Sequence, residues 1–281
     1  MTSRRDIVTL ATVFLIVLAG CGGSPGDTTT TTTTETISGD VSLPPGLSQS
    51  EITNVSKLTR AHQRALAQTG FEVQATIDAT INGSQGTVSQ HVTQRNVVES
   101  GYSAFLVNSS SRQGKRTATF TYWGNESTAL YRVSQGQTIR YRTVPQSLNI
   151  STFTSFSDSL GIYLTLGDYS VTNVNETGEE TLITLQATRP NPSPNQNITS
   201  LAAENVSSYT GTVVVDSSGV VHSLNVNLTA TTSRGDATYS LSYELVRTGK
   251  VNVPRPDWIQ EALASTIQAD FNATLTKEYV K

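Results

Sequence analysis

The sequence predicts an α+β fold in which a large curved antiparallel β-sheet of about eleven strands has helices packed on its concave face. Many segments alternate apolar and polar residues, as strands with one dry and one wet face do. Short turns rich in Asn, Gly, Asp and Ser separate these segments, which favours antiparallel neighbours. Three other segments carry apolar residues at helical spacing, so helices are expected to cover the dry face.

Residues 1–20 are predicted to be a signal peptide. Arg4 and Arg5 form a positively charged start, and the apolar run over residues 7–19 is shorter than the roughly 20 residues of a bilayer-spanning helix. The run ends in Leu18-Ala19-Gly20-Cys21, which resembles the lipobox of prokaryotic lipoproteins. That resemblance implies cleavage after Gly20 and a diacylglyceryl lipid on Cys21. The alternative is an ordinary secretory signal with an incidental cysteine.

The route of export and the tether follow from the same region. Arg4 and Arg5, with Ile7 at the apolar position, also resemble a twin-arginine export signal, and a generic basic start is the alternative. Residues 21–47 include an unbroken threonine run at residues 28–34 and almost nothing apolar, so they are predicted to be a tether. Residues 48–281 are then a single α+β domain, held by a lipid at the extracellular face of the cytoplasmic membrane.

Acceptor motifs for N-glycosylation, Asn-x-Ser/Thr, recur along the chain. They occur at Asn54, Asn82, Asn108, Asn125, Asn149, Asn175, Asn197, Asn205, Asn227 and Asn272. A composition rich in Thr and Ser places some of these motifs by chance, but their number favours a surface glycoprotein. Asn227 alternates with Val226 and Leu228, so it is predicted to face water, and Asn82 is predicted at a turn tip.

The domain is predicted to open with a helix followed by a strand. Ser48 and Glu51 have the spacing of a capping box, apolar residues between 52 and 66 lie near helical spacing, and Thr69-Gly70 ends the helix. Residues 71–81 alternate strictly, with Phe71, Ala75 and Ala79 among those on the dry face. Asn82-Gly83 is a hairpin turn.

The remaining elements follow from the same patterns. Ten further strands are predicted at residues 88–98, 102–108, 116–123, 129–133, 138–144, 169–174, 180–188, 209–216, 220–231 and 237–247. A second helix is predicted over residues 153–163. A last short helix is predicted after Asp257, which has Gln260 at capping spacing and an apolar face of Trp258, Ile259, Ala262 and Leu263.

Two resemblances follow from these features. A curved sheet of this kind resembles the fold of the outer-membrane lipoprotein carrier and of mycobacterial lipid-binding lipoproteins. The Cys21-Gly22-Gly23 start, the threonine tether and the sequence VPRPDW at residues 253–258 resemble uncharacterised haloarchaeal surface lipoproteins over most of the chain. The first resemblance implies a lipid or another hydrophobic ligand, and the second implies no known activity.

No residue pattern predicts catalysis, a cofactor or a metal. His62, His91 and His222 share no metal-ligand spacing, one cysteine cannot form a thiolate site, and nucleophile-elbow and phosphate-loop motifs are absent. The chain is therefore predicted not to be an enzyme. His222 is in phase with apolar neighbours on a dry face. A core or sheet-end histidine bonded to a carbonyl is the favoured interpretation, and a polar group in an apolar cavity is the alternative.

Several charged groups have ordinary explanations. Glu179 and Glu180 are adjacent, so their side chains point to opposite strand faces and do not share acid–base work. Residues 234–236, Arg-Gly-Asp, are predicted to be a hairpin turn, and Arg140 and Arg142 a solvated surface. The net charge of −3 gives no electrostatic support for binding to nucleic acid.

Two functions remain. The first is a binding module with an apolar pocket between the sheet and the helices that contain Leu58 and Phe156. The small residues Ala75, Ala79 and Ala237 on the dry face would leave room for a hydrophobic ligand there. The second is a non-enzymatic structural or interaction protein of the cell envelope with a filled core. The sequence identifies no protein partner.

Overall fold

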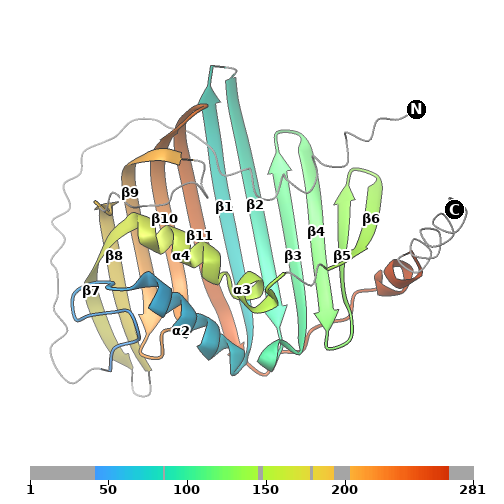
Figure 1. Cartoon of the computed structure of the whole chain (residues 1–281), viewed down its shortest axis with the longest axis horizontal. Coiled ribbons are helices and arrows are strands. Elements are labelled where there is room, and N and C mark those ends of the chain that lie inside the picture. The colour runs from blue at the N-terminus through green and yellow to red at the C-terminus, as the bar shows by residue number, and fades with distance from the viewer. Residues whose placement is uncertain (1–41, 85, 145–147, 178–179, 193–202, 266–281) are drawn as a thin grey trace, which may run out of the picture.

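The computed structural model describes residues 42–84, 86–144, 148–177, 180–192 and 203–265. Within these residues, eleven strands form one antiparallel sheet in the order β6-β5-β4-β3-β2-β1-β11-β10-β9-β8-β7. Strands β1 to β6 form one meander and β7 to β11 form another, and the pairing of β1 with β11 joins the two (Figure 1). The predicted large antiparallel sheet is therefore confirmed.

Each predicted strand has a counterpart, although most are longer at their ends than the sequence pattern indicates. The bounds are β1 (Gly70–Gly83), β2 (Gly86–Val98), β3 (Ala104–Gln113), β4 (Arg116–Asn125), β5 (Ala129–Gln135), β6 (Thr138–Thr143), β7 (Gly167–Thr177), β8 (Glu180–Pro190), β9 (Ala203–Asp216), β10 (Val221–Thr232) and β11 (Gly235–Gly249). Strand β3 starts later than predicted, because residues 100–102 form a 3₁₀ turn before it.

The helix α2 (Val55–Ala67) begins later than predicted. Its N-cap is Asn54, whose side chain accepts a hydrogen bond from the backbone N–H of Lys57 at 2.9 Å. Ser48 does accept a hydrogen bond from the N–H of Glu51 at 3.1 Å, but these residues lie in a turn that is closed by a β-bridge between Leu47 and Ile52. The capping spacing therefore marks a turn here and not a helix start.

The predicted second helix is two helices, α3 (Ile150–Ser155) and α4 (Ser157–Leu166). Phe156 separates them with φ 62°, in the left-handed region that residues with a side chain seldom adopt. Since β6 and β7 are the two edge strands of the sheet, the chain must cross the sheet between them, and it does so through α3 and α4 (Figure 1). The turn at Phe156 redirects the chain on this path.

The main core lies between these helices and one half of the sheet. We call the sheet face that bears Ala75 and Tyr243 the helix side, and the face that bears Gln74 and Glu244 the open side; the register pairs Ala75 with Tyr243 and Gln74 with Glu244. On the helix side, β1 and β7–β11 contribute buried aliphatic residues and tyrosines that form one cluster with Leu58 of α2 and residues of α4. Figure 1 shows α2 and α4 in front of these strands.

The last predicted helix packs on the other face of the sheet. Residues 259–265 are helical, and Ile259 and Ala262 form a second apolar cluster with Leu106, Trp123 and Leu130. These three strand residues alternate with helix-side residues of β3–β5, so they lie on the open side. The helices therefore do not all cover one face.

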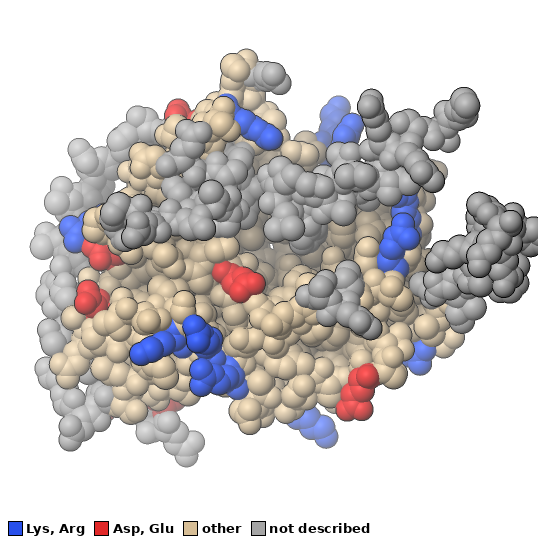
Figure 2. Space-filling view, in the orientation of Figure 1, with Lys and Arg blue, Asp and Glu red and all other residues tan. Residues whose placement is uncertain are grey.

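Figure 2 shows a group of basic side chains over α2. Lys57, Arg60 and Arg64 are exposed and lie along the solvent face of that helix, opposite its buried face. Among the described residues, no helix combines the length and the apolar character that crossing a membrane requires.

Candidate functional site

The predicted pocket between the sheet and the helices is filled. Leu58 and Phe156, which were expected to line it, are 0% and 7% exposed, and both belong to the main core cluster. The small residues Ala75, Ala79 and Ala237 do lie on the helix side, as predicted, and all three are buried. They belong to the same core cluster as Leu58 and Phe156.

Two glycines show how closely this interior is packed. A Cβ on Gly167, at the start of β7, or on Gly211, in β9, would overlap the rings of Tyr169 and Tyr209. Those tyrosines are 3% and 1% exposed, and the hydroxyl of Tyr169 donates a hydrogen bond to that of Tyr209 at 2.8 Å. Tyr209 in turn donates to the backbone oxygen of Tyr163 in α4 at 2.7 Å. The rings of Tyr169 and Tyr209 therefore occupy the space next to the two glycines, and Tyr209 links α4 to the sheet.

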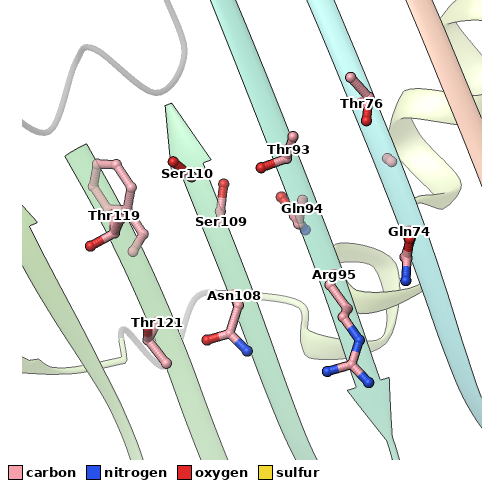
Figure 3. Close-up of a pocket in the computed structure, with 12 residues that line it drawn as sticks. Gln74, Thr76, Thr93, Gln94, Arg95, Asn108, Ser109, Ser110, Thr119 and Thr121 are labelled. Carbon is pink, nitrogen blue, oxygen red and sulfur yellow. The ribbon is translucent and has the colours of Figure 1, made fainter. Parts of the chain in front are cut away.

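A pocket of about 540 Å³ lies elsewhere, over strands β1–β4. Eight of its twelve lining residues occupy open-side positions, so the pocket faces away from α2 and α4. Figure 3 shows these eight on four neighbouring strands: Gln74, Thr76, Thr93, Arg95, Asn108, Ser110, Thr119 and Thr121. Hydroxyl, amide and guanidinium groups can form hydrogen bonds with a polar surface, but they supply no acid–base pair.

An ion-pair cluster borders this pocket. Glu72 of β1 is 4% exposed, and its carboxylate accepts hydrogen bonds from Nε of Arg95 at 2.6 Å and Nε of Arg247 at 2.9 Å. Both guanidinium groups also contact Glu72 through Nη2, at 2.6 and 2.7 Å. Burial acts to raise the pKa of Glu72, but the hydrogen bonds and charges of Arg95 and Arg247 outweigh it and lower that pKa. The three residues brace β2, β1 and β11 on the open side.

His62 is a structural residue inside the core. It is fully buried, and its Nδ1 accepts a hydrogen bond from the backbone N–H of Val221 at 3.1 Å. Its Nε2 therefore carries the proton and donates to the carbonyl of Ser155 at 3.1 Å. Burial lowers the pKa of His62 to about 4, although the carbonyl of Ser155 and the charge of Asp216 act in the opposite direction. The neutral ring joins α2 to β10 and to the end of α3.

His91 lies on the surface. Its Nδ1 is 2.7 Å from a carboxylate oxygen of Asp78 on the neighbouring strand, and both side chains are well exposed. The pair is a cross-strand contact on the open side of β1 and β2. His91 therefore lies apart from the buried His62.

His222 lies at a sheet end, near the start of β10, which is one of the two predicted positions. The predicted carbonyl partner is wrong: the side chain is 31% exposed, and its Nε2 contacts Oδ2 of Asp216 at 3.0 Å and Oε1 of Glu180 at 3.3 Å. A β-bulge between Val221 and Ser223 breaks the alternation of β10 against β9, so the sequence phase does not hold at this residue. Chiefly through its hydrogen bond to Asp216, the pKa of His222 is raised.

The remaining charged residues singled out from the sequence lie as follows. Arg140 and Arg142 are exposed on β6, in line with the predicted solvated surface. Residues 234–236 form the β10–β11 turn and the start of β11, as predicted. Glu179 lies outside the described residues, whereas Glu180 begins β8.

Some of the predicted export and modification sites lie within the described residues, and others lie outside them. Arg4, Arg5, Gly20 and Cys21 lie outside the described residues, so the signal, cleavage and lipid predictions stay predictions. The sequons at Asn197 and Asn272 also lie outside. The described sequon asparagines are all exposed: Asn54, Asn82, Asn108, Asn125, Asn149, Asn175, Asn205 and Asn227. Asn227 alternates with buried Val226 and Leu228, as predicted. Their glycosylation stays a prediction.

Comparison with known proteins places the chain in a family. It matches the family described as "Family of unknown function (DUF7537)" over residues 6–262, and it belongs to that family. No curated protein matches its sequence.

The chain is also similar to several solved structures. LprF from Mycobacterium bovis is 8% identical with a TM-score of 0.34, over 74% of this chain and 99% of that one. A LolA superfamily protein from Nitrosomonas europaea is 7% identical with a TM-score of 0.27, over 73% of this chain and 99% of that one. A DUF1329 family protein from Desulfovibrio piger is 9% identical with a TM-score of 0.28, over 73% of this chain and 95% of that one.

Proposed function

We propose that this member of the family is a lipid-anchored protein of the cell envelope, and that its domain is a non-enzymatic interaction or structural module with a filled core. The observation that carries the proposal is the closed interior at Gly167 and Gly211, where the rings of Tyr169 and Tyr209 leave no space for even a Cβ. A site for a small molecule typically needs about 300 Å³ or more. A ligand beneath α4 would have to separate that helix from β9 and break the hydrogen bond from Tyr209 to Tyr163.

The anchor and the location rest on the sequence. The lipobox resemblance at residues 18–21 supports a lipid on Cys21, and the threonine-rich tether would hold the domain away from the membrane. Exposure of the described sequon asparagines supports a location outside the cell, where glycosyltransferases reach the surface of the domain. Partners would then contact the outside of the domain, where the polar pocket over β1–β4 offers hydroxyl, amide and guanidinium groups for hydrogen bonds.

Native mass spectrometry with lipid extraction tests the filled core. The full chain, purified from membranes in mild detergent, should carry the covalent lipid on Cys21 and no second, non-covalent lipid. The Ala79→Trp variant should give the same lipid content. A stoichiometric non-covalent lipid that disappears in Ala79→Trp would overturn the proposal, because it would place a ligand beneath the helices.

A second candidate is a hydrophobic ligand on the part of the helix side that α2 and α4 do not cover. There, half-buried apolar and aromatic residues of β2, β4 and β5 lie on one face: Val92, Tyr122, Tyr131 and Val133. Tyr122 stacks on Tyr131 with ring centroids 5.3 Å apart and meets Phe153 of α3 edge-on at 5.2 Å. A non-covalent lipid that is lost in Tyr131→Ser but kept in Ala79→Trp would favour this candidate.

A further inference from the structure

Three side chains from neighbouring strands converge at one end of the sheet. Glu180 is the first residue of β8, Asp216 is the last residue of β9, and His222 lies near the start of β10. Nε2 of His222 is 3.0 Å from Oδ2 of Asp216 and 3.3 Å from Oε1 of Glu180. The three ligand atoms all lie within 4.8 Å of one another.

The backbone positions two of these groups. Oδ1 of Asp216 accepts hydrogen bonds from the N–H and hydroxyl of Ser218, at 2.8 and 2.6 Å, and from the N–H of Val220 at 3.0 Å. These bonds orient the carboxylate, so that its second oxygen, Oδ2, points at the imidazole. The bulge in β10 turns His222 towards it, out of the alternation that buries Val221 and Leu224.

The spacing suits a first-row divalent metal ion. Two ligand atoms that each lie about 2.1 Å from an ion are about 3.0 Å apart in octahedral and about 3.4 Å apart in tetrahedral coordination. The two distances from Nε2 of His222 fall within this range. Imidazole nitrogen favours zinc and its transition-metal neighbours, whereas calcium and magnesium prefer sites made of oxygen atoms alone.

We propose that Glu180, Asp216 and His222 form a binding site for Zn²⁺ or a similar transition-metal ion, with one imidazole and two carboxylate ligands. The side chain of Asp216 is 12% exposed, that of His222 31% and that of Glu180 49%, so the ion would sit at the surface and keep positions open for water. The hydrogen bonds to Oδ1 of Asp216 would serve as the outer shell that orients a metal ligand.

Without an ion, the Nε2–H of His222 donates a hydrogen bond to Oδ2 of Asp216 at 3.0 Å, and Nε2 lies 3.3 Å from Oε1 of Glu180. A metal must displace that proton, because coordination uses the lone pair of Nε2. Metal and proton therefore compete for one atom. His62 does not supply a ligand, because its two ring nitrogens are bonded to the carbonyl of Ser155 and to the N–H of Val221.

Calorimetric titration of the full chain with Zn²⁺ at pH 7.5 and pH 5.5 tests the site. We expect one ion per chain at pH 7.5 and at least tenfold weaker binding at pH 5.5. His222→Gln and Asp216→Asn should each weaken binding at pH 7.5 by at least tenfold, and Asp216→Asn keeps the Oδ1 that orders the turn. Glu180→Gln, at an exposed position, serves as a third variant if either of the others fails to fold.

His91→Gln is the matched control, because His91 also contacts a carboxylate, that of Asp78, but belongs to no group of three candidate ligands among the described residues. It should bind Zn²⁺ like the parent, and so should Cys21→Ser, which replaces the single cysteine. With Co²⁺ as the probe, the parent should show visible absorption bands that His222→Gln lacks. No binding at pH 7.5, equal binding by His222→Gln, or loss of binding in His91→Gln or Cys21→Ser would overturn the proposal.

Discussion

The stability of the domain should depend on His62 and, through it, on pH. His62→Phe keeps an aromatic ring of similar size but removes both hydrogen bonds of the imidazole. The buried N–H of Val221 and the carbonyl of Ser155 then lose their partner, at about 1–3 kcal/mol each. We expect His62→Phe to lower the free energy of unfolding at pH 7 by about 3–5 kcal/mol.

The pH dependence has a definite sign. Because the pKa of His62 is lowered from 6.5 to about 4 in the folded protein, the unfolded chain takes up a proton first as the pH falls. The stabilisation is complete above pH 6.5, and it is lost as the pH falls towards 4. At about 1.4 kcal/mol per pH unit, the loss between pH 7 and pH 5 is about 2 kcal/mol. The pKa of His222 is raised in the folded protein, so its effect on stability has the opposite pH dependence. The stabilisation from His222 is present at low pH and is lost as the pH rises through its folded pKa.

Urea unfolding followed by circular dichroism at pH 7 and pH 5 measures this effect. The quantity to compare is the stability difference between the parent and His62→Phe, because the contribution of His222 is common to both. That difference should shrink by about 2 kcal/mol at pH 5. A difference that stays constant or grows at pH 5 would refute the assignment of a neutral His62. His62→Gln, which can still donate and accept but does not titrate, should lose less stability at pH 7 than His62→Phe does.

Four further outcomes are expected. Glu72→Gln should lower the free energy of unfolding, measured in urea, by about 2–3 kcal/mol, because two arginines lose a buried carboxylate. The control Glu244→Gln, at an exposed position, should change it by less than about 0.5 kcal/mol. Equal effects would contradict the role of Glu72 in linking β2, β1 and β11. Ala79→Trp should destabilise by about 1–3 kcal/mol by overpacking, with no effect of added lipid on its thermal melt. Cys21→Ser should give a protein that is uncleaved or released and that lacks the lipid-modified mature form, whereas unchanged detergent partitioning with the same mature mass would exclude the lipid. Asn227→Gln should lower the intact mass by one glycan, and an unchanged glycan mass would show that this sequon is unused.

Sequence periodicity was sufficient to predict the strands. In β1, the residues predicted for the dry face include Phe71, Ala75 and Ala79, and all three are buried on the helix side. The same holds for Asn227, which is exposed between two buried neighbours. Alternation has this power because each strand residue must point to one face or the other, and only one face of this half of the sheet is dry.

Local spacing failed wherever a partner distant in the sequence decides the geometry. The bulge that re-aims His222 depends on how β10 pairs with β9, and the break at Phe156 depends on the path between two edge strands. The alternation of residues 71–81 assigns Glu72 to the face opposite Phe71, and it lies on that face. Arg95 and Arg247 pair with its carboxylate there, and the residue is only 4% exposed. No pattern around Glu72 contains those arginines.

The sequence by itself determined which residues alternate, where the strands and most turns fall, and which cysteine has the context of a lipid anchor. Only the tertiary structure decided that aromatic rings fill the space beneath α4, and that Glu180, Asp216 and His222 meet. The reason is the distance along the chain between interacting groups: Val221 and His62, for example, are joined by a hydrogen bond across 159 residues. Periodicity assigns a side chain to a face, whereas the neighbour that it meets there is set by the order in which strands pair and by the way helices cross them.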